Sequence, residues 1–240
     1  MKKKVLILAN NASGLYDFRN ELLLRLLEDY EVHVSLPDAE EMPQIAEEGC
    51  IVHETFLERR GMNPLKDGKL MADYLKLMRK VKPDVVLTYT IKPNIYGNLC
   101  CRILKIPYIV NITGLGSAFE NDGLLRKIVV FLYKLALKDA SCIFFQNVKN
   151  QNIFSSFGIK GKKECLVPGS GVNLERHMFE EYPKEDEPIK IVFVGRIMKE
   201  KGTDELLYTA EKIKQEYNNV QFELIGSYED DYKELVEQKE

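Results

Sequence analysis

Two cationic side chains, Arg196 and Lys201, stand five residues apart on an expected turn between a strand and a helix. The run Ile189–Val194 favours a strand, and a helical pattern begins near Thr203, which we interpret as the N-cap of that helix. A guanidinium, an ammonium and a helix N-terminus together suit a diphosphate group. The alternative interpretation is that both cations are solvated side chains on a surface turn.

Polar segments rich in glycine, amides and hydroxyls follow five of the expected strands. These segments are Asn10–Gly14, Thr90–Asn94, Asn111–Ser117, Pro168–Gly171 and Gly195–Arg196. In an open parallel sheet the carboxyl ends of the strands share one edge, where ligands bind. A single such loop is uninformative, because βα turns favour these residue types in any case. Five of them at one edge predict a ligand crevice.

The elements that must position these loops alternate regularly along the chain. The expected strands are Lys4–Ala9, Glu31–Leu36, Cys50–Glu54, Asp84–Tyr89, Tyr108–Asn111, Ser141–Gln146, Glu164–Val167, Ile189–Val194 and Val220–Ile225. Several are apolar throughout, which is typical of strands buried on both faces of a parallel sheet, and amphipathic helical stretches separate them. The pattern predicts a doubly wound α/β domain over residues 1–175.

A second α/β domain is expected to start after a linker. Residues 176–188 include a proline- and acid-rich stretch without apolar periodicity, which favours a linker. Residues 189–240 then resume a βαβα pattern, ending in an acidic helix. Two strands and two helices leave open sheet edges and half a core, so we expect this second domain to be incomplete and the chain to be a portion of a longer protein.

Several classes of function lack their sequence signatures. Gly114-Leu115-Gly116 begins like a dinucleotide fingerprint, but Phe119 occupies the position that needs a small residue. The chain has no P-loop motif, no Asp-x-Asp pair for a divalent metal and no G-x-S-x-G elbow. A net charge of -3 argues against a nucleic-acid partner. We therefore expect no bound metal, no cofactor and no hydrolase triad.

Cysteine usage and the N-terminus indicate a cytoplasmic protein. The five cysteines form no C-x-x-C pair, and we interpret them as buried, reduced thiols. Only five apolar residues, Val5–Ala9, follow the N-terminal lysines, and a signal peptide needs a longer apolar core. No stretch approaches the length of a membrane span.

The chain resembles a known family in three segments. "VGRIMKEKGTDELLYTAEKI" resembles the start of the donor domain in family-4 glycosyltransferases of the GT-B fold. "VPGSGVNLERH" is similar to the loop at their domain junction, and "TYTIKPNIYGNLCCRILKIPYIVNITGLGSAF" resembles the acceptor-domain core of members that build bacterial surface polysaccharides. The resemblance covers essentially the whole chain and implies a GT-B fold with two Rossmann-like domains.

The resemblance implies a transferase that moves a sugar from a nucleotide-sugar, with a UDP-sugar expected, to a glycan or polyprenyl-diphosphate-linked acceptor. Transfer would retain the anomeric configuration and need no metal. The donor-binding residues would be Ser13, Gly14, Gly171, Gly195, Arg196 and Lys201, with Arg196 and Lys201 also catalytic, and the acceptor-binding residues would be Asn11, Thr90, Lys92, Asn94, Thr113 and Gly114. Fixed cations on the diphosphate would stabilise the charge that grows as the glycosidic bond breaks.

The chain departs from the family pattern in two places. Asn111-Ile112-Thr113-Gly114 stands where many members carry a histidine, so that residue's role does not carry over. The family's Glu-x7-Glu motif belongs later in the second domain; the pairs Glu229/Glu237 and Glu40/Glu48 match its spacing by chance. Two alternatives therefore stay open, a non-catalytic sugar- or nucleotide-binding module from a truncated gene and a UDP-sugar epimerase of the same fold.

One expected helix, from Leu124 to Lys138, has a basic character. It carries Arg126, Lys127, Lys134 and Lys138, with the aromatic residues Phe131 and Tyr133 interleaved. A basic amphipathic face with aromatics suits an anionic membrane surface, which would place the protein peripherally at the cytoplasmic face of the membrane. A solvated face on a packed helix is the competing interpretation.

Overall fold

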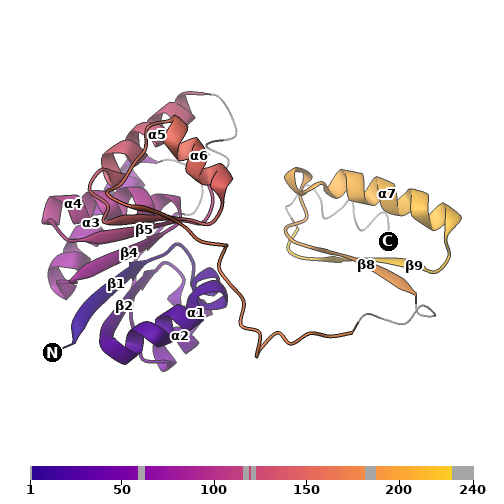
Figure 1. The fold of residues 1–240 in the computed structure, drawn as a ribbon, viewed down its shortest axis with the longest axis horizontal. Coiled ribbons are helices and arrows are strands. Elements are labelled where there is room, and N and C mark those ends of the chain that lie inside the picture. The colour runs from indigo at the N-terminus through magenta and orange to yellow at the C-terminus, as the bar shows by residue number, and fades with distance from the viewer. Residues whose placement is uncertain (1, 59–62, 116–118, 120–122, 182–187, 229–240) are drawn as a thin grey trace. The chain divides into compact units, whose positions relative to one another are not determined.

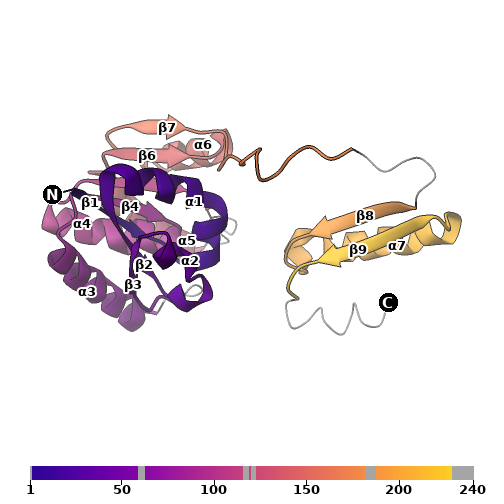
Figure 2. The same cartoon turned by 90° about the horizontal axis from the view of Figure 1, so that it is seen from below.

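A computed structural model describes all residues except 1, 59–62, 116–118, 120–122, 182–187 and 229–240. The chain divides into two compact units, Met1–Asn173 and Leu174–Glu240 (Figures 1 and 2). Each unit is an α/β structure of its own. The residues expected to form the final acidic helix lie outside the described residues, as does much of the expected linker.

The first unit is built on a seven-stranded, wholly parallel sheet in the order β3-β2-β1-β4-β5-β6-β7. Its strands are β1 (Lys3–Leu8), β2 (Tyr30–Leu36), β3 (Ile51–Glu54), β4 (Val85–Tyr89), β5 (Tyr108–Ile112), β6 (Cys142–Phe145) and β7 (Glu164–Leu166). The order reverses between β1 and β4, which is where a doubly wound sheet opens a crevice. The predicted strands are confirmed, each to within one residue at either end.

Helices cover both faces of this sheet (Figure 1). They are α1 (Ala12–Asp29), α2 (Gln44–Glu47), α3 (Pro64–Val81), α4 (Asn98–Leu104), α5 (Leu124–Leu137) and α6 (Val148–Ser156), with the short turns η1 (Ala39–Glu41) and η2 (Pro93–Gly97). Strand β1 shows why both faces are needed: Val5 and Ile7 pack in the core under α1 and α2, whereas Leu6 and Leu8 pack under the other helices. The predicted doubly wound α/β architecture is therefore confirmed.

Local sequence signals fix the ends of α3, the helix that supports one side of the site described below. Asn63 accepts hydrogen bonds from the backbone N–H groups of Leu65 and Lys66, and Pro64 stands at the first helical position. Lys82 ends the helix in the left-handed conformation, at φ 54°. These caps set which side chains of α3 face the sheet.

The second unit contains the parallel strands β8 (Ile189–Val194) and β9 (Val220–Ile225), the turn η4 (Lys199–Lys201) and the helix α7 (Thr203–Glu216). Ile197 and Leu207 are buried at the centre of its small core. The strand–helix–strand order confirms the expected start of a second α/β element. The residues described beyond the first unit form no further strand before β8.

Candidate functional site

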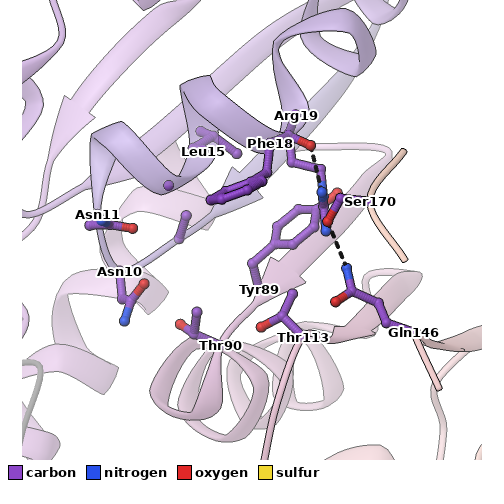
Figure 3. Close-up of a pocket in the computed structure, with 12 residues that line it drawn as sticks. Asn10, Asn11, Leu15, Phe18, Arg19, Tyr89, Thr90, Thr113, Gln146 and Ser170 are labelled. Atoms are coloured by element: carbon purple, nitrogen blue, oxygen red, sulfur yellow. Dashed lines mark hydrogen bonds between the residues drawn. The ribbon is translucent and has the colours of Figure 1, made fainter. Parts of the chain in front are cut away.

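A pocket of about 360 Å³ lies at the carboxyl edge of the seven-stranded sheet. It is lined by Ala9, Asn10, Asn11, Gly14, Leu15, Phe18, Arg19, Tyr89, Thr90, Thr113, Gln146 and Ser170 (Figure 3). These residues come from the ends of β1, β4, β5 and β6, from the start of α1 and from the segment after β7. Four of the five predicted strand-end segments therefore contribute to one cavity, whereas the fifth, Gly195–Arg196, follows β8 in the separate two-stranded sheet of the second unit.

The tight turn into α1 forms one wall of the pocket. Asn11 stands in extended backbone at the N-cap position, and the Ala12 N–H donates to Asp38 Oδ1 at 2.9 Å. A Cβ on Gly14 would lie 2.5 Å from Asn11 Oδ1. Because such a contact is too short for any real Cβ, only glycine leaves the Asn11 amide in place beside the cavity.

An aromatic and cationic wall faces this turn. The Phe18 side chain is 60% exposed, and the Arg19 guanidinium lies 5.4 Å from the centroid of the buried Tyr89 ring. Arg19 also donates to the Phe18 carbonyl oxygen (Figure 3). Burial raises the pKa of the Tyr89 hydroxyl, so that hydroxyl stays protonated and able to donate. Arg19 is the one cationic side chain lining the pocket among the described residues.

Sequence reasoning missed Phe18, Arg19 and Tyr89 as pocket residues. A signal was present in the spacing, because residues four and seven or eight positions after Asn11 return to the same face of α1. Leu15, Phe18 and Arg19 occupy those positions. Gln146 was also missed, whereas Ser170 belongs to the predicted segment Pro168–Gly171. The Gln146 amide donates to Ser170 Oγ at 3.2 Å and ties the segment after β7 to the pocket rim.

Thr90 lies at the pocket with a strained backbone. Its φ is +70°, in the left-handed region, which is rare for a β-branched residue. Its hydroxyl oxygen is buried and has no hydrogen-bond partner among the described residues. Strained residues with unsatisfied polar groups cluster at functional sites, because the surrounding structure must enforce them. Within the described part of the chain, the Thr90 hydroxyl is therefore an unpaired, buried polar group beside the cavity.

A buried ion pair holds the segment that follows Thr90. The Lys92 ammonium lies 2.8 Å from Asp67 Oδ1, and the Tyr96 hydroxyl donates to Asp67 Oδ2 at 2.8 Å. The side chains of Lys92 and Asp67 are only 11% and 7% exposed. Lys92 was predicted to bind the acceptor, but its ammonium is directed at α3 and does not line the pocket. Its structural role is to anchor η2 against α3.

The remaining predicted residues fall into two groups. Asn11, Gly14, Thr90 and Thr113 line the pocket, as the strand-end argument expects. Ser13, Asn94, Gly114 and Gly171 do not line it. Asn94 is buried and donates from its amide to the Asn111 carbonyl at 3.0 Å, so it supports the end of β5. Gly114 and Gly171 are exposed.

In the second unit, Arg196 and Lys201 lie on an ordered turn. The Gly195 N–H donates to the Ile225 carbonyl and the Ile197 N–H to the Ser227 carbonyl, each at 2.9 Å. Because Ile197 is fully buried, the exposed Arg196 beside it is held at the carboxyl end of β8. Lys201 closes η4, immediately before α7.

The predicted N-cap of α7 was wrong. Gly202, at φ +77°, is the N-cap, and Thr203 is already helical. The Thr203 hydroxyl instead exchanges hydrogen bonds with Met198, accepting from its N–H at 3.1 Å and donating to its carbonyl at 2.9 Å. This exchange closes the turn that displays Arg196. Asp204 and Glu205 stand in the first turn of α7 and complement the helix dipole, so anion binding here depends on the two cations.

We expect the substitution Thr90→Gly to leave the free energy of unfolding unchanged or to raise it by up to about 1 kcal/mol, because glycine adopts φ +70° without strain. The matched control is Thr88→Gly, two residues earlier in β4, where the hydroxyl lies 3.3 Å from Asn98 Oδ1 and the backbone is regular. That control should lower the free energy of unfolding measured in urea. Equal decreases in the free energy of unfolding of the two variants would contradict the presence of backbone strain at Thr90.

Comparisons with known proteins place most of the chain in one family. The family model described as Glycosyl transferase 4-like matches residues 4–147, which is more than half of the chain. The model described as Glycosyl transferases group 1 matches residues 175–240. The boundary between the two matches falls near the boundary between the two compact units.

Curated relatives are similar over nearly the whole chain. N,N'-diacetylbacillosaminyl-diphospho-undecaprenol alpha-1,3-N-acetylgalactosaminyltransferase of Campylobacter jejuni is 27% identical over 237 residues, covering 91% of this chain and 62% of that protein. The capsular polysaccharide biosynthesis glycosyltransferase CapM of Staphylococcus aureus is 25% identical over 239 residues, covering 95% of this chain and 62% of that protein. The chain thus spans less than two thirds of the length of these relatives.

Solved structures share the fold. Sucrose-phosphate synthase of Thermosynechococcus elongatus superposes with a TM-score of 0.72 at 14% identity, covering 99% of this chain and 68% of that one. Anabaena HepE, solved in complex with UDP-glucose, superposes with a TM-score of 0.72 at 16% identity, covering 98% of this chain and 65% of that one. At these identities the likeness concerns the fold alone, and the predicted GT-B type α/β fold is confirmed.

Proposed function

Because this chain belongs to the glycosyl transferase 4-like family, we propose that it transfers a sugar from a nucleotide-sugar to a polyprenyl-diphosphate-linked glycan in polysaccharide biosynthesis. The observation that carries the proposal is the pocket at the carboxyl edge of the seven-stranded sheet, with its amide, hydroxyl, aromatic and guanidinium lining. The Campylobacter relative, named for a diphospho-undecaprenol substrate, supports the acceptor class. The Staphylococcus relative, named for capsular polysaccharide biosynthesis, supports the role in polysaccharide synthesis.

The pocket in the first unit is assigned to the acceptor. Its volume falls within the range of small-molecule pockets. Phe18 offers apolar surface to a sugar ring, whereas Asn10, Asn11 and Thr113 offer hydrogen bonds to its hydroxyls. Arg19 supplies the positive charge that an acceptor diphosphate needs next to its sugar.

The turn in the second unit is assigned to the donor. Arg196 and Lys201 would bind the diphosphate of a nucleotide-sugar, with UDP-sugars as the expected class. Negative charge grows on that diphosphate as the bond to the sugar breaks, so the cations stabilise the transition state more than the ground state. We propose that they replace a metal ion and that transfer retains the anomeric configuration.

The proposal is tested with the enzyme expressed from its complete gene. UDP- and GDP-sugars are offered with polyprenyl-diphosphate-linked acceptors, and both nucleotide release and the glycosylated lipid are measured, with and without a chelator. Acceptor-dependent nucleotide release that the chelator leaves unchanged is expected. Conversion of the donor sugar to its epimer would support the epimerase alternative, and nucleotide binding without turnover would support the non-catalytic module.

Replacement of Arg19 by alanine should raise the KM for the lipid-linked acceptor by roughly 10- to 100-fold, because a charged hydrogen bond is worth about 1.5–3 kcal/mol. The KM for the nucleotide-sugar should change little. Arg25→Ala is the control, since Arg25 lies on the same helix but is exposed and paired with Glu28. An increase confined to the KM of the donor would contradict the assignment of this pocket.

A further inference from the structure

Helix α5 (Leu124–Leu137) has apolar side chains on its solvent side as well as on its core side. Its buried face is formed by Val129, Val130, Tyr133, Ala136 and Leu137. A helix buried on one face normally presents polar residues on the other. The opposite face of α5 does not follow this rule.

The outward face carries an apolar stripe. It consists of Leu124, Leu125, Ile128, Phe131 and Leu135, which are 74%, 49%, 39%, 64% and 42% exposed. Four of these residues are spaced by three or four positions, so they form one continuous row along the helix. Single exposed apolar residues are ordinary, but a row of this kind marks an interaction surface.

Three lysines flank the stripe on one side. Lys127, Lys134 and Lys138 are exposed, with spacings of seven and four residues that keep them on one edge of the row. Helix α5 contains no aspartate or glutamate. Among the described residues, the surface therefore combines apolar side chains with a row of lysines along one edge of the helix.

This surface differs from the basic face expected from the sequence. Tyr133, predicted to stand among the lysines, is fully buried and belongs to the core. The Arg126 guanidinium lies 5.4 Å from the centroid of the Phe157 ring, so it packs on α6. The five stripe residues and three lysines are thus what α5 presents outward.

The position of α5 relates this surface to the pocket within the first unit. Helix α5 packs against η2, whose Asn94 lies beside the Tyr133 hydroxyl, and η2 directly follows the segment of Thr90. The chain also runs from Thr113, at the pocket, through the buried Leu115 and Phe119 to the start of α5. Helix α5 therefore contacts an element, η2, that begins three residues after Thr90 of the pocket.

We propose that α5 docks this protein on an anionic membrane surface, lying in the plane of the interface with its apolar stripe inserted and its lysines at the phosphate groups. Basic amphipathic helices bind lipid in this way. A second copy of α5 would offer these lysines no carboxylate, whereas a membrane of anionic lipids offers phosphate groups. The proposal does not depend on the transfer reaction, since membrane binding is measured without substrate.

The test uses co-flotation of the chain with vesicles of phosphatidylglycerol mixed with phosphatidylcholine, and with vesicles of phosphatidylcholine alone. The wild-type chain should float with the anionic vesicles, and less so at high salt. The double substitution Lys127→Glu/Lys134→Glu should lower its partition coefficient by roughly tenfold or more. Phe131→Ser should lower binding by roughly tenfold as well, because its ring leaves the acyl region.

The matched control is Lys69→Glu/Lys76→Glu on α3, which changes two exposed lysines at the same seven-residue spacing and by the same total charge. It should leave most of the binding intact. Equal losses in the two double variants, or no flotation of the wild-type chain, would overturn the proposal. A wild-type dimer that Phe131→Ser converts to a monomer, without vesicle binding, would assign the stripe to a second copy instead.

Discussion

Replacing Arg196 by alanine is expected to lower the turnover number of the enzyme by roughly 10²–10³-fold, the loss typical of removing one group that stabilises transition-state charge. The buried Ile197 and the Gly195 hydrogen bond hold Arg196 at the end of β8, so its charge is positioned before the donor binds. The effect should fall on turnover more than on the KM for the nucleotide-sugar, because the diphosphate charge grows only as the glycosidic bond breaks.

The control for this prediction is Lys190→Ala. Lys190 is a cation of the same strand but near its opposite end, where it pairs with Glu223 at 3.2 Å. Removing the Lys190 ammonium should change the turnover number by less than about threefold, as expected for a solvated surface ion pair. Arg196→Lys should fall between wild type and alanine, because an ammonium keeps the charge without the bidentate geometry. Turnover of Arg196→Ala close to that of Lys190→Ala would remove Arg196 from the mechanism.

The fold could be predicted because the apolar runs and turn residues that determine its strands and helices are visible in short stretches of sequence. A strand such as β1 alternates between two cores, so nearly every residue in it must be apolar, and that run is visible in the sequence. Turn residues then mark where each strand ends. Since the seven strands of the first unit are parallel, their carboxyl ends meet at one edge, and Asn11, Thr90 and Thr113, which follow three of them, line one pocket.

The parts that could not be predicted depend on contacts between distant segments. Lys92 follows strand β4 at the edge of the sheet that carries the pocket. Nothing in the neighbouring sequence indicates that its ammonium donates a hydrogen bond to Asp67, twenty-five residues earlier. Arg19 lies at the pocket with its guanidinium over the ring of Tyr89, which stands seventy residues later at the end of β4. Such pairings follow from how helices pack on the sheet, which a single sequence does not specify.

The α5 surface shows a related limit. A count of basic and aromatic residues suggested a membrane helix but included Tyr133, which the sheet buries. The periodicity of α5 is ambiguous because both of its faces are apolar, and only the packing determines which row faces outward. The side chains left exposed, and not the composition of the helix, therefore define the surface.

Asp67→Ala is expected to lower the free energy of unfolding of the first unit by about 3–5 kcal/mol, the usual cost of leaving a buried charge without its partner. The substitution strands the Lys92 ammonium and also removes the acceptor of the Tyr96 hydroxyl. A loss of this size should lower the melting temperature of the unit by about 10 °C or more in a calorimetric scan. Because η2 follows Thr90, the KM for the acceptor should rise as well.

Two further variants separate the ion pair from general damage to α3. Asp73→Ala removes a carboxylate from the same helix at a position outside the pair and should cost less than about 1 kcal/mol. The double variant Asp67→Leu/Lys92→Met removes both charges, so it should recover much of the stability that Asp67→Ala loses. It should nevertheless keep a raised KM for the acceptor, because the hydrogen bond from Tyr96 is still missing. If the double variant is as unstable as Asp67→Ala, a stranded charge is not the cause of the loss, and the anchor must act through packing of α3 alone.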